Sequence, residues 1–538
     1  MFERLRRYRS RITLSLSALL VVLSFLGIAE WLARCYAPSA HPLTLGPDYI
    51  LFLRENMQPL FHVRSIHGQT YLVRNDVVWE PPANERFPFD KPSGVRRIII
   101  VGESSADDLG NALETQVADG AGAKRYEVLN CAISGADLNI VERRAKECLR
   151  YSPDAVIFLF GHNLYYFHPI MSPFLLKLAL WMRSSALFYD LDALEKPRRY
   201  EYAERLRALE TFIDKLARET KSRNIPLILA TVPSNLWVEP QTSTLDESDP
   251  TYLNTLYNYA IGRRQQAISL LTQALNTHAC ALWHFTLGTW LYRKGAWQKA
   301  YAQLILARDL DPARMRASTA VNDTIRRAAI RDGVSLIDAE RIISEQSPHG
   351  IPGWAQFMDA QHATENNFSR LASLCAAQLM KNGWGSPISE GRITKSRSSH
   401  PIKYEYVASA FYGLPRPAPD GWRTFSYFAQ SHLSQMTTNV GPLFIRAFPN
   451  PRERASAFLG LAQALWRAGR RAEARADNAK AKRLADDWDA PNMQSGFFDL
   501  QEHRRQEALG DFRRALKKRP KDARALFFIY KLETHRNG

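Results

Sequence analysis

Cysteine is scarce in this chain, and its spacing is unpaired. The 538 residues contain only Cys35, Cys131, Cys148, Cys280 and Cys375. Their positions show neither the ligand spacing of a metal cluster nor the framework of a disulfide-rich secreted domain. No metal or other cofactor is therefore expected. Because Cys131 ends an apolar run and Cys375 lies on the apolar face of a helical pattern, we interpret both as small buried hydrophobic residues.

Acidic residues are outnumbered by basic ones, which gives a net charge of +17. Such an excess of basic residues can indicate binding to nucleic acid or to anionic lipid head groups. Most often it reflects only an arginine-rich solvated surface. No zinc-finger spacing or RNA-binding signature accompanies it, so nucleic acid is not an expected partner. The apolar fraction of 46% and charged fraction of 23% exclude a largely disordered or fibrous chain. At roughly 150 residues per domain, the length suggests about three structural units.

A charge-free apolar run near the N-terminus extends from Ile12 to Ala29 and follows five arginines. As a helix it would be about 27 Å long, near the hydrocarbon thickness of a bilayer. We therefore predict a single-pass membrane anchor over residues 1–36, with a cytoplasmic N-terminus and a periplasmic or extracellular remainder. The alternative of a cleaved signal peptide lacks a small-x-small site after the run, and Arg34 opposes a lipoprotein cysteine at Cys35.

Five short apolar runs alternate with helical patterns beyond a connecting segment at residues 37–94. Continuous Ile, Val and Leu suit parallel strands that are buried on both faces and joined by helical crossovers. The pattern predicts a three-layer α/β domain over residues 95–382. The expected strands are Ile98–Val101, Val128–Cys131, Ala155–Phe160, Leu227–Val232 and Val334–Asp338.

The connection between the fourth and fifth of these strands is too long for a normal crossover, and it carries a repeat. The repeat matches the offsets of a tetratricopeptide helix pair, and we predict an all-α insert at residues 252–315. The positions are Ala267, Leu271, Ala274, Leu287, Gly288, Ala300, Leu304, Ala307 and Pro312. Plain helix-hairpin packing is the alternative.

A second helical region follows a basic, Ser/Gly-rich linker at residues 383–400. This C-terminal extension covers residues 401–538, of which residues 401–442 have no assignment. Beyond them, small residues recur at tetratricopeptide offsets, namely Ala474, Ala481, Ala508 and Ala515. Single units need neighbours to bury their apolar faces, and stacked units present grooves, so a protein partner is expected at residues 252–315 and 443–534.

Four short blocks carry candidate chemistry. Ser104 stands in Gly-Glu-Ser-Ser directly after the first strand, at the edge where open α/β folds build their sites. Such a serine alone is usually only a helix cap. The later blocks are Ala-Ile-Ser-Gly ending at Gly135, Gly-His-Asn ending at Asn163, and Asp-Ala-Gln-His from Asp359 to His362.

These blocks, in this order, resemble the SGNH (GDSL-like) hydrolase family over residues 95–382. Val-Pro-Ser-Asn-Leu after the fourth strand and Ile-Pro-Gly-Trp-Ala-Gln-Phe before the last block are similar to a bacterial subgroup with tetratricopeptide repeats. The resemblance implies a flavodoxin-like SGNH fold and a serine esterase without cofactor, acting on acyl esters of carbohydrate or cell-envelope polymers. Acyl transfer is a close variant. The alternative is a non-catalytic tetratricopeptide scaffold for envelope assembly.

The resemblance also implies a role for each block. Ser104 would be the nucleophile, His362 its general base, and Asp359 the group that orients the imidazole. The backbone N–H groups of Ser104 and Gly135 and the side-chain amide of Asn163 would form the oxyanion hole. Each residue also has a structural interpretation: Asn163 as a turn residue, Asp359 as a helix cap and His362 as a loop histidine.

The sequence departs from the family pattern at two positions. Glu103 replaces the usual aspartate of the first block, and Asn367 stands where a glycine often follows the histidine. Neither has a proposed catalytic role. Ser105 is a rival nucleophile, and His162 is expected to line the pocket. The apolar segment 169–191 is expected to cover the site or to rest on a membrane surface.

Overall fold

The computed structural model describes twelve stretches of the chain. They are residues 21–22, 24–29, 31, 58–74, 86–119, 126–165, 202–240, 244–381, 429–430, 433–437, 445 and 450–534. The expected linker, most of residues 401–442, and the apolar segment 169–191 lie outside them.

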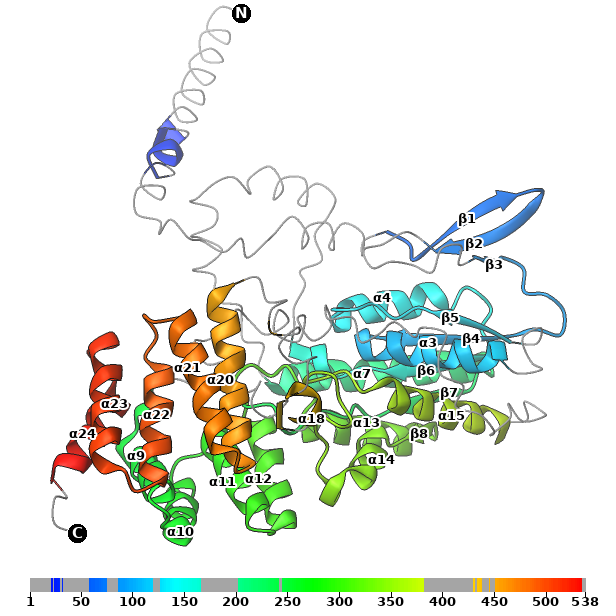
Figure 1. Cartoon of the computed structure of the whole chain (residues 1–538). Helices are drawn as coiled ribbons and strands as arrows, with labels where there is room; N and C mark the ends of the chain where they lie inside the picture. Colours follow the sequence, from blue (N-terminus) through cyan, green and yellow to red (C-terminus); the bar gives the residue numbers. More distant parts are fainter. Residues whose placement is uncertain are drawn as a thin grey trace, which may run out of the picture.

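A five-stranded parallel sheet forms the centre of the predicted α/β domain (Figure 1). All five predicted strands are confirmed, with small shifts at their ends. They are β4 (Arg96–Gly102), β5 (Tyr126–Asn130), β6 (Ala155–Leu159), β7 (Leu227–Ala230) and β8 (Ser335–Ile337). Their order is β5-β4-β6-β7-β8, so the first strand lies between the second and the third. This is a doubly wound order, and its switch point lies between β4 and β6.

Helices cover the sheet in two groups. Helix α3 (Ser104–Asp119) packs against α15 (Glu365–Lys381). In the other group α7 (Tyr202–Ser222) packs against α4 (Leu138–Cys148) and α13 (Thr319–Asp332). Two groups of helices around one parallel sheet make the predicted three layers.

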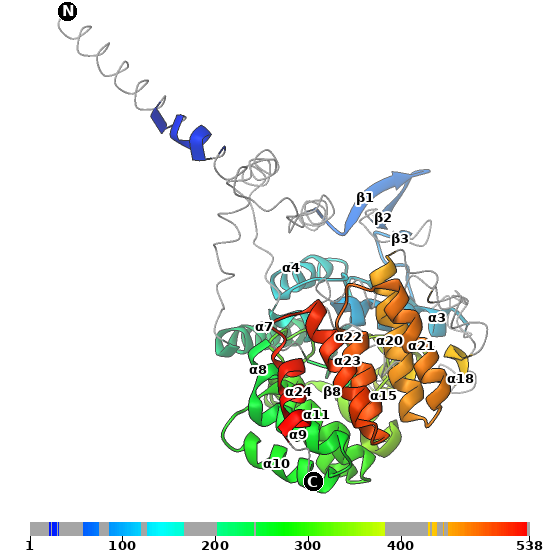
Figure 2. The ribbon, with the colours of Figure 1, turned by 60° about the vertical axis from the view of Figure 1, so that its left-hand side comes forward.

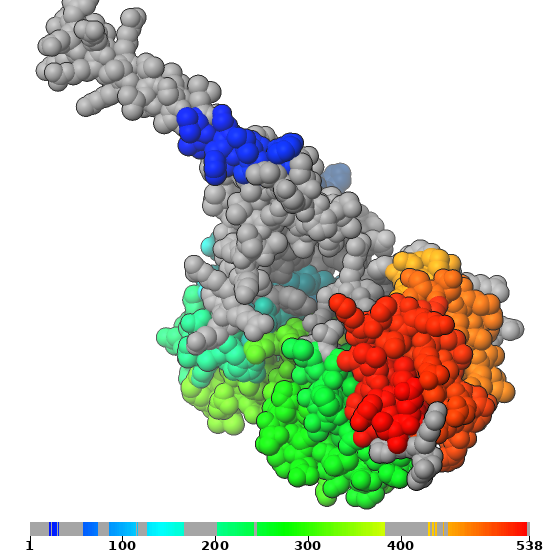
Figure 3. All heavy atoms as spheres, turned by 90° about the vertical axis from the view of Figure 1, so that its left-hand side faces the viewer, coloured from blue at the N-terminus to red at the C-terminus, as the bar shows by residue number. Residues whose placement is uncertain are grey.

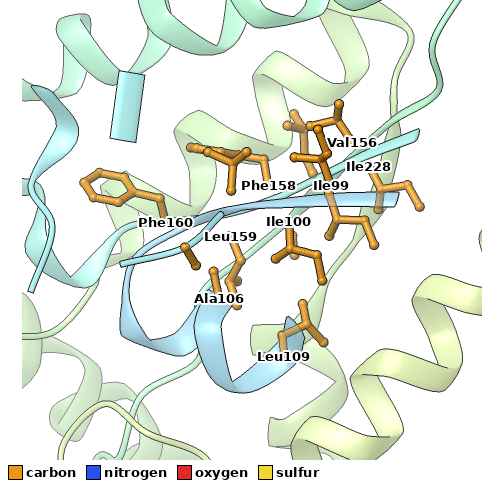
Figure 4. Close-up of a cluster of buried hydrophobic side chains, with 14 of the residues drawn as sticks. Ile99, Ile100, Ala106, Leu109, Val156, Phe158, Leu159, Phe160 and Ile228 are labelled. Carbon is orange, nitrogen blue, oxygen red and sulfur yellow. The ribbon is translucent and has the colours of Figure 1, made fainter. Parts of the chain in front are cut away.

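The core of this α/β domain lies between β4, β6 and α3. Figure 4 shows Ile99 and Ile100 of β4 beside Phe158 of β6, with Ala106 and Leu109 of α3 beneath them. All five side chains are at most 1% exposed. The continuous apolar strands are therefore buried on both faces, as the absence of alternation in their sequence indicates.

The connecting segment contains a sheet of its own, which the sequence pattern did not indicate. Strands β1 (Phe61–Ile66), β2 (Gln69–Arg74) and β3 (Arg86–Pro88) pair antiparallel. The sheet is attached to α4, because Glu147 accepts a hydrogen bond of 2.6 Å from the backbone N–H of Leu60.

One expectation about cysteine is wrong. Cys131 and Cys148 are both fully buried but are joined in a disulfide, because the end of α4 returns beside the residue that follows β5. Their separation of 17 residues gave no recognisable framework. Cys375 is buried and free, as expected.

The predicted insert consists of antiparallel helices. They are α9 (Pro250–Ala260), α10 (Arg264–Leu275), α11 (Ala281–Arg293) and α12 (Trp297–Asp309). Gly288 of α11 permits the close approach of α12, since a Cβ at this position would lie 2.9 Å from Leu304. Ala300, Leu304 and Ala307 are at most 1% exposed, which confirms their predicted place between paired helices.

The C-terminal extension repeats this arrangement. Its helices are α20 (Pro451–Arg467), α21 (Arg471–Leu484), α22 (Ala490–Gln501), α23 (Arg505–Lys518) and α24 (Ala523–Thr534). Gly496 has the role of Gly288, because a Cβ there would lie 2.6 Å from the ring of Phe512. The four alanines predicted at helix contacts in this region are completely buried.

The two helical regions, predicted as separate units, pack into one helical array formed by α9–α12 and α20–α24. Leu253 and Ala260 of α9 share an apolar cluster with Phe512 and Phe528 of the C-terminal region. Figures 2 and 3 show the insert, in green, against the C-terminal helices, in orange and red. Each region therefore supplies the neighbour that the other needs to bury its outer face.

The predicted membrane location is wrong. Within the described stretches, no helix has the length and apolar character needed to cross a bilayer. Of the predicted anchor over residues 1–36, only residues 21–22, 24–29 and 31 belong to the described stretches.

Candidate active site

Ser104 begins α3 immediately beyond the sheet. β4 ends at Gly102, where a Cβ would lie 1.9 Å from the backbone oxygen of Leu159 in β6, so only glycine fits. Ser104 is partly exposed, whereas Ser105 is 3% exposed and its hydroxyl has no hydrogen-bond partner among the described residues. Of the two serines, Ser104 is the one that a substrate can reach.

Glu103 joins the first block to the third. Its side chain is completely buried, and its two carboxylate oxygens accept three backbone hydrogen bonds. The donors are the N–H groups of Gly161, His162 and Asn163, at 3.0, 2.7 and 2.7 Å. These bonds fix the Gly-His-Asn block next to Ser104. Glu103 is therefore a positioning residue, a role that its departure from the family pattern did not indicate.

Burial raises the pKa of Glu103 to about 7, although the three N–H donors act in the opposite direction. Asp108, about one turn further on, also has its pKa raised to about 7 by burial. Two carboxylates with high pKa values thus flank Ser104 in the sequence, Glu103 just before α3 and Asp108 within it.

Two expected oxyanion donors lie at the ends of the neighbouring strands. Asn163 is 4% exposed and lies in the short helix η1 (His162–Tyr165), which follows β6. Gly135 follows β5 and has a φ of +74°, a left-handed conformation that favours glycine. The backbone N–H of Ile133, two residues earlier, donates to the oxygen of Gly102 at 3.2 Å, which ties this loop to the Ser104 turn. These positions place the Gly135 N–H and the Asn163 amide at the edge of the sheet where Ser104 begins α3.

Asp359 and His362 form a close pair before α15. Asp359 Oδ2 lies 2.6 Å from His362 Nδ1, and Oδ1 accepts the backbone N–H of His362 at 2.7 Å. Burial by itself would lower the pKa of His362, but Asp359 outweighs it, and with the charges of Asp108 and Glu103 the pKa rises to about 9. Burial would raise the pKa of Asp359, yet the charge and hydrogen bonds of His362 lower it.

The same interactions indicate that His362 lies near the Ser104 turn. Asp108 and Glu103 act electrostatically on His362, and Ser104 lies between them in the sequence. Ser104 and Asp108 share one face of α3, because they are four residues apart. Since α3 also packs against α15, the structure brings Ser104, Asn163, Asp359 and His362 to one edge of the sheet. This edge is the switch point between β4 and β6.

Asn235 is a site residue that sequence reasoning missed. It belongs to the Val-Pro-Ser-Asn-Leu block after β7 and is completely buried. Its side-chain amide nitrogen donates to the backbone oxygen of Asp359 at 3.0 Å. Its backbone N–H donates to the backbone oxygen of Ala360 at 3.1 Å. Its side-chain oxygen accepts the N–H of Trp237 at 2.9 Å. The block was noted for its resemblance alone, but it holds the Asp359–His362 loop against the sheet.

His162 and Asn367 have structural roles. The Nδ1 of His162 accepts the backbone N–H of Ala317 at 3.0 Å, and burial lowers its pKa to about 3, so the ring is neutral. This suits the expected pocket-lining residue. Asn367 donates to the oxygen of Gln356 and to the hydroxyl of Thr364, both at 3.1 Å, and so closes the last loop onto the start of α15.

Comparison with known proteins identifies no family. The sequence matches no model of a known protein family, and no curated protein matches it. The complex of the yeast Sti1 TPR2AB domain with pHSP90 is 14% identical, covers 54% of this chain and 99% of that chain, and has a TM-score of 0.15. Yeast Tom70 is 14% identical, covers 74% of this chain and 85% of that chain, and has a TM-score of 0.18. At such scores the assignment of helical pairs depends on the packing described above, and the SGNH resemblance stays a prediction.

The role of Asn235 can be tested by substitution. Asn235→Ala removes the hydrogen bond to the oxygen of Asp359 and the one from the N–H of Trp237, at a cost of about 0.5–1.5 kcal/mol each. We expect a lower melting temperature of the full chain and a weaker Asp359–His362 pair, detectable as a lower imidazole pKa by NMR. Gln378→Ala, which removes a side-chain bond to Ser335 far along α15, is the control. An unchanged His362 pKa in Asn235→Ala would show that the loop is held by other contacts.

Proposed function

We propose that this protein hydrolyses acyl esters at Ser104 and binds a protein partner through its helical array. The esterase part depends mainly on one observation: Glu103 fixes the Gly161–Asn163 block beside Ser104 by three hydrogen bonds, and the Asp359–His362 pair lies near the same turn. A nucleophile, a base with its orienting group, and N–H donors at one sheet edge are the parts that acyl transfer requires.

The chemistry follows from these positions. The hydroxyl oxygen of Ser104 attacks the acyl carbonyl, and its proton passes to Nε2 of His362. Asp359 holds the opposite nitrogen and stabilises the imidazolium. The carbonyl oxygen gains negative charge, which the N–H groups of Ser104 and Gly135 and the amide of Asn163 stabilise by about 3 kcal/mol each. The alcohol leaves with the proton from His362, and water then releases the acid by the same steps.

The proposed substrate class is the acyl ester in general. The sequence-based preference for carbohydrate or cell-envelope esters relied partly on an extracytoplasmic location, and that location is no longer supported. Acyl transfer needs the same residues, with an acceptor hydroxyl in place of water. Product analysis with and without an added sugar acceptor distinguishes the two reactions.

Substitution of the two adjacent serines tests the nucleophile. Ser104→Ala should abolish hydrolysis of a nitrophenyl ester by the purified full chain, and His362→Ala should come close to the same loss because the two residues act as one unit. Ser105→Ala is the matched control and should keep most of the rate, since its hydroxyl is buried. The opposite pattern would move the nucleophile to Ser105. A wild-type chain without esterase activity would leave only the scaffold role.

The protonation state of His362 gives a second test. The base must be neutral, so kcat/KM should rise with pH and level off near the histidine pKa of about 9. Because this pKa is raised above its ordinary value of 6.5, the pair stabilises the fold fully below pH 6.5 and loses this contribution as pH rises through about 9. Asp359→Asn removes the charge that contributes most to the raised pKa of His362. The rise of kcat/KM should then occur at lower pH, and its plateau should be lower. A pH profile that this substitution leaves unchanged would contradict the pairing.

The partner-binding part is carried by the helical array and by a basic cavity on it. The cavity has a volume of about 290 Å³ and lies between α21, α22 and α23. It is lined by Lys482, Ala485, Trp488, Asn492, Arg514, Lys517 and Lys518. Lys482 and Arg514 are paired with Asp511 at 3.3 and 2.6 Å, so Lys517 and Lys518 are the cations that favour a partner segment with carboxylates. A non-catalytic scaffold would need only this part of the molecule.

Charge reversal tests the partner surface. Lys517→Glu with Lys518→Glu should remove a partner that co-purifies with the wild-type chain from the source cells, and the wild-type association should weaken as salt is raised. Arg293→Glu with Lys299→Glu reverses two exposed charges elsewhere on the array and is the matched control. Equal sets of co-purifying proteins from both variants would exclude the cavity as the contact.

A further inference from the structure

Three side chains with metal-binding atoms meet in the insert, away from the candidate active site. Asp246 comes from the short helix α8 (Thr244–Ser248), and His278 and Cys280 come from the turn between α10 and α11. The carboxylate oxygen, imidazole nitrogen and thiol sulfur all lie within 4.8 Å of one another. Across the described residues, no other group of three such side chains comes as close together.

The three atoms suit a zinc-type ion. Bonds of about 2.0–2.3 Å from a tetrahedral Zn²⁺ place its ligand atoms roughly 3–4 Å apart, so small side-chain adjustments bring this set into range. Sulfur, nitrogen and oxygen donors together favour Zn²⁺ or Co²⁺ over the hard ions Ca²⁺ and Mg²⁺, which prefer oxygen alone. The exposed side chain of His278 leaves a fourth position open to solvent, because 54% of its surface is accessible.

The surroundings hold each ligand in place. Trp283 donates its indole N–H to the backbone oxygen of Asp246 at 3.2 Å, and its ring lies 4.8 Å from that of His278. Trp283 is itself stacked on Tyr252. Residues that orient metal ligands from behind are a usual part of protein metal sites.

Cys280 is placed at the start of a helix. It is the N-cap residue of α11, it is 6% exposed, and its side chain makes no capping hydrogen bond. Burial raises the pKa of its thiol, although the backbone N–H groups of Trp283 and Leu282 act in the opposite direction. A metal ion bound here would therefore displace the thiol proton, as metal binding to cysteine generally does.

We propose that Asp246, His278 and Cys280 bind a divalent zinc-type ion through three protein ligands, with water or a further ligand in the fourth position. The ion would join α8 to the turn between α10 and α11. It would also lie beside the contact of the insert with the C-terminal helices, where Glu247 pairs with Arg524 of α24 at 3.3 Å. Metal binding should therefore strengthen the helical array as well as the insert.

Cobalt(II) is the suitable probe, because its absorption reports both tetrahedral geometry and a thiolate ligand. The chelator-treated full chain, with its Cys131–Cys148 disulfide kept intact, should bind one Co²⁺ with a thiolate charge-transfer band, and Zn²⁺ should displace it. Zn²⁺ should also raise the melting temperature. His278→Ala should weaken Co²⁺ binding at least about tenfold, a loss typical even of residues behind the ligands.

Cys280→Ser should remove the charge-transfer band and the stabilisation by Zn²⁺. Serine is a favoured N-cap residue, so this variant should fold. Cys375→Ser, which changes the other free cysteine described, should keep both, and Cys35→Ser controls for the remaining thiol. A band that persists in Cys280→Ser, or no band in the unmodified chain, would overturn the proposal. Neither outcome depends on whether Ser104 is catalytic.

Discussion

The candidate site depends on one set of interactions: the buried carboxylate of Glu103 accepts hydrogen bonds from three backbone N–H groups. It connects the residue after β4 to the three residues that begin the turn after β6. In a doubly wound sheet these two strand ends lie side by side at the switch point, where the loops diverge and leave a crevice. Backbone groups at such an edge have no strand partners, so a carboxylate that binds three of them sets the shape of the crevice floor.

The helical insert is part of this site as well as part of the array. The segment that leads from α12 back to the sheet contacts three site loops in succession. The oxygen of Met315 accepts from the Gln361 side chain, Arg316 donates to the oxygen of Asn235 at 3.0 Å, and the N–H of Ala317 binds His162. Arg316 is itself 3% exposed and is paired with Asp311 at 2.9 Å. The segment that ends the insert is thus bonded directly to the loop that carries His362, through the side chain of Gln361.

Periodic and local features were predictable from the sequence. Unbroken apolar runs located all five parallel strands, and small residues at fixed offsets located the helix pairs, because burial leaves a direct mark on composition. The residues proposed for catalysis were found by the order of their blocks, and Ser104, Asn163, Asp359 and His362 do come together. Their chemistry still stays a prediction.

Features that depend on contacts between distant segments were not predictable. Glu103 and Asn235 act on backbone groups that follow other strands, and a backbone acceptor has no sequence signature. The disulfide between Cys131 and Cys148 and the union of the two helical regions also depend on tertiary packing. The membrane prediction was made from hydropathy alone, and no helix among the described residues is long and apolar enough to cross a bilayer.

The central claim, that Glu103 assembles a working acyl-transfer site around Ser104, is tested most directly by a crystal structure of the full chain after reaction with a fluorophosphonate. The account predicts phosphorus bonded to the Ser104 oxygen, with a phosphoryl oxygen facing the Gly135 N–H and the Asn163 amide and with His362 Nε2 in hydrogen-bond range. The Glu103 bonds to the Gly-His-Asn block should be intact. An adduct on another residue, an unmodified protein, or Asn163 and His362 turned away from the phosphorus would contradict it.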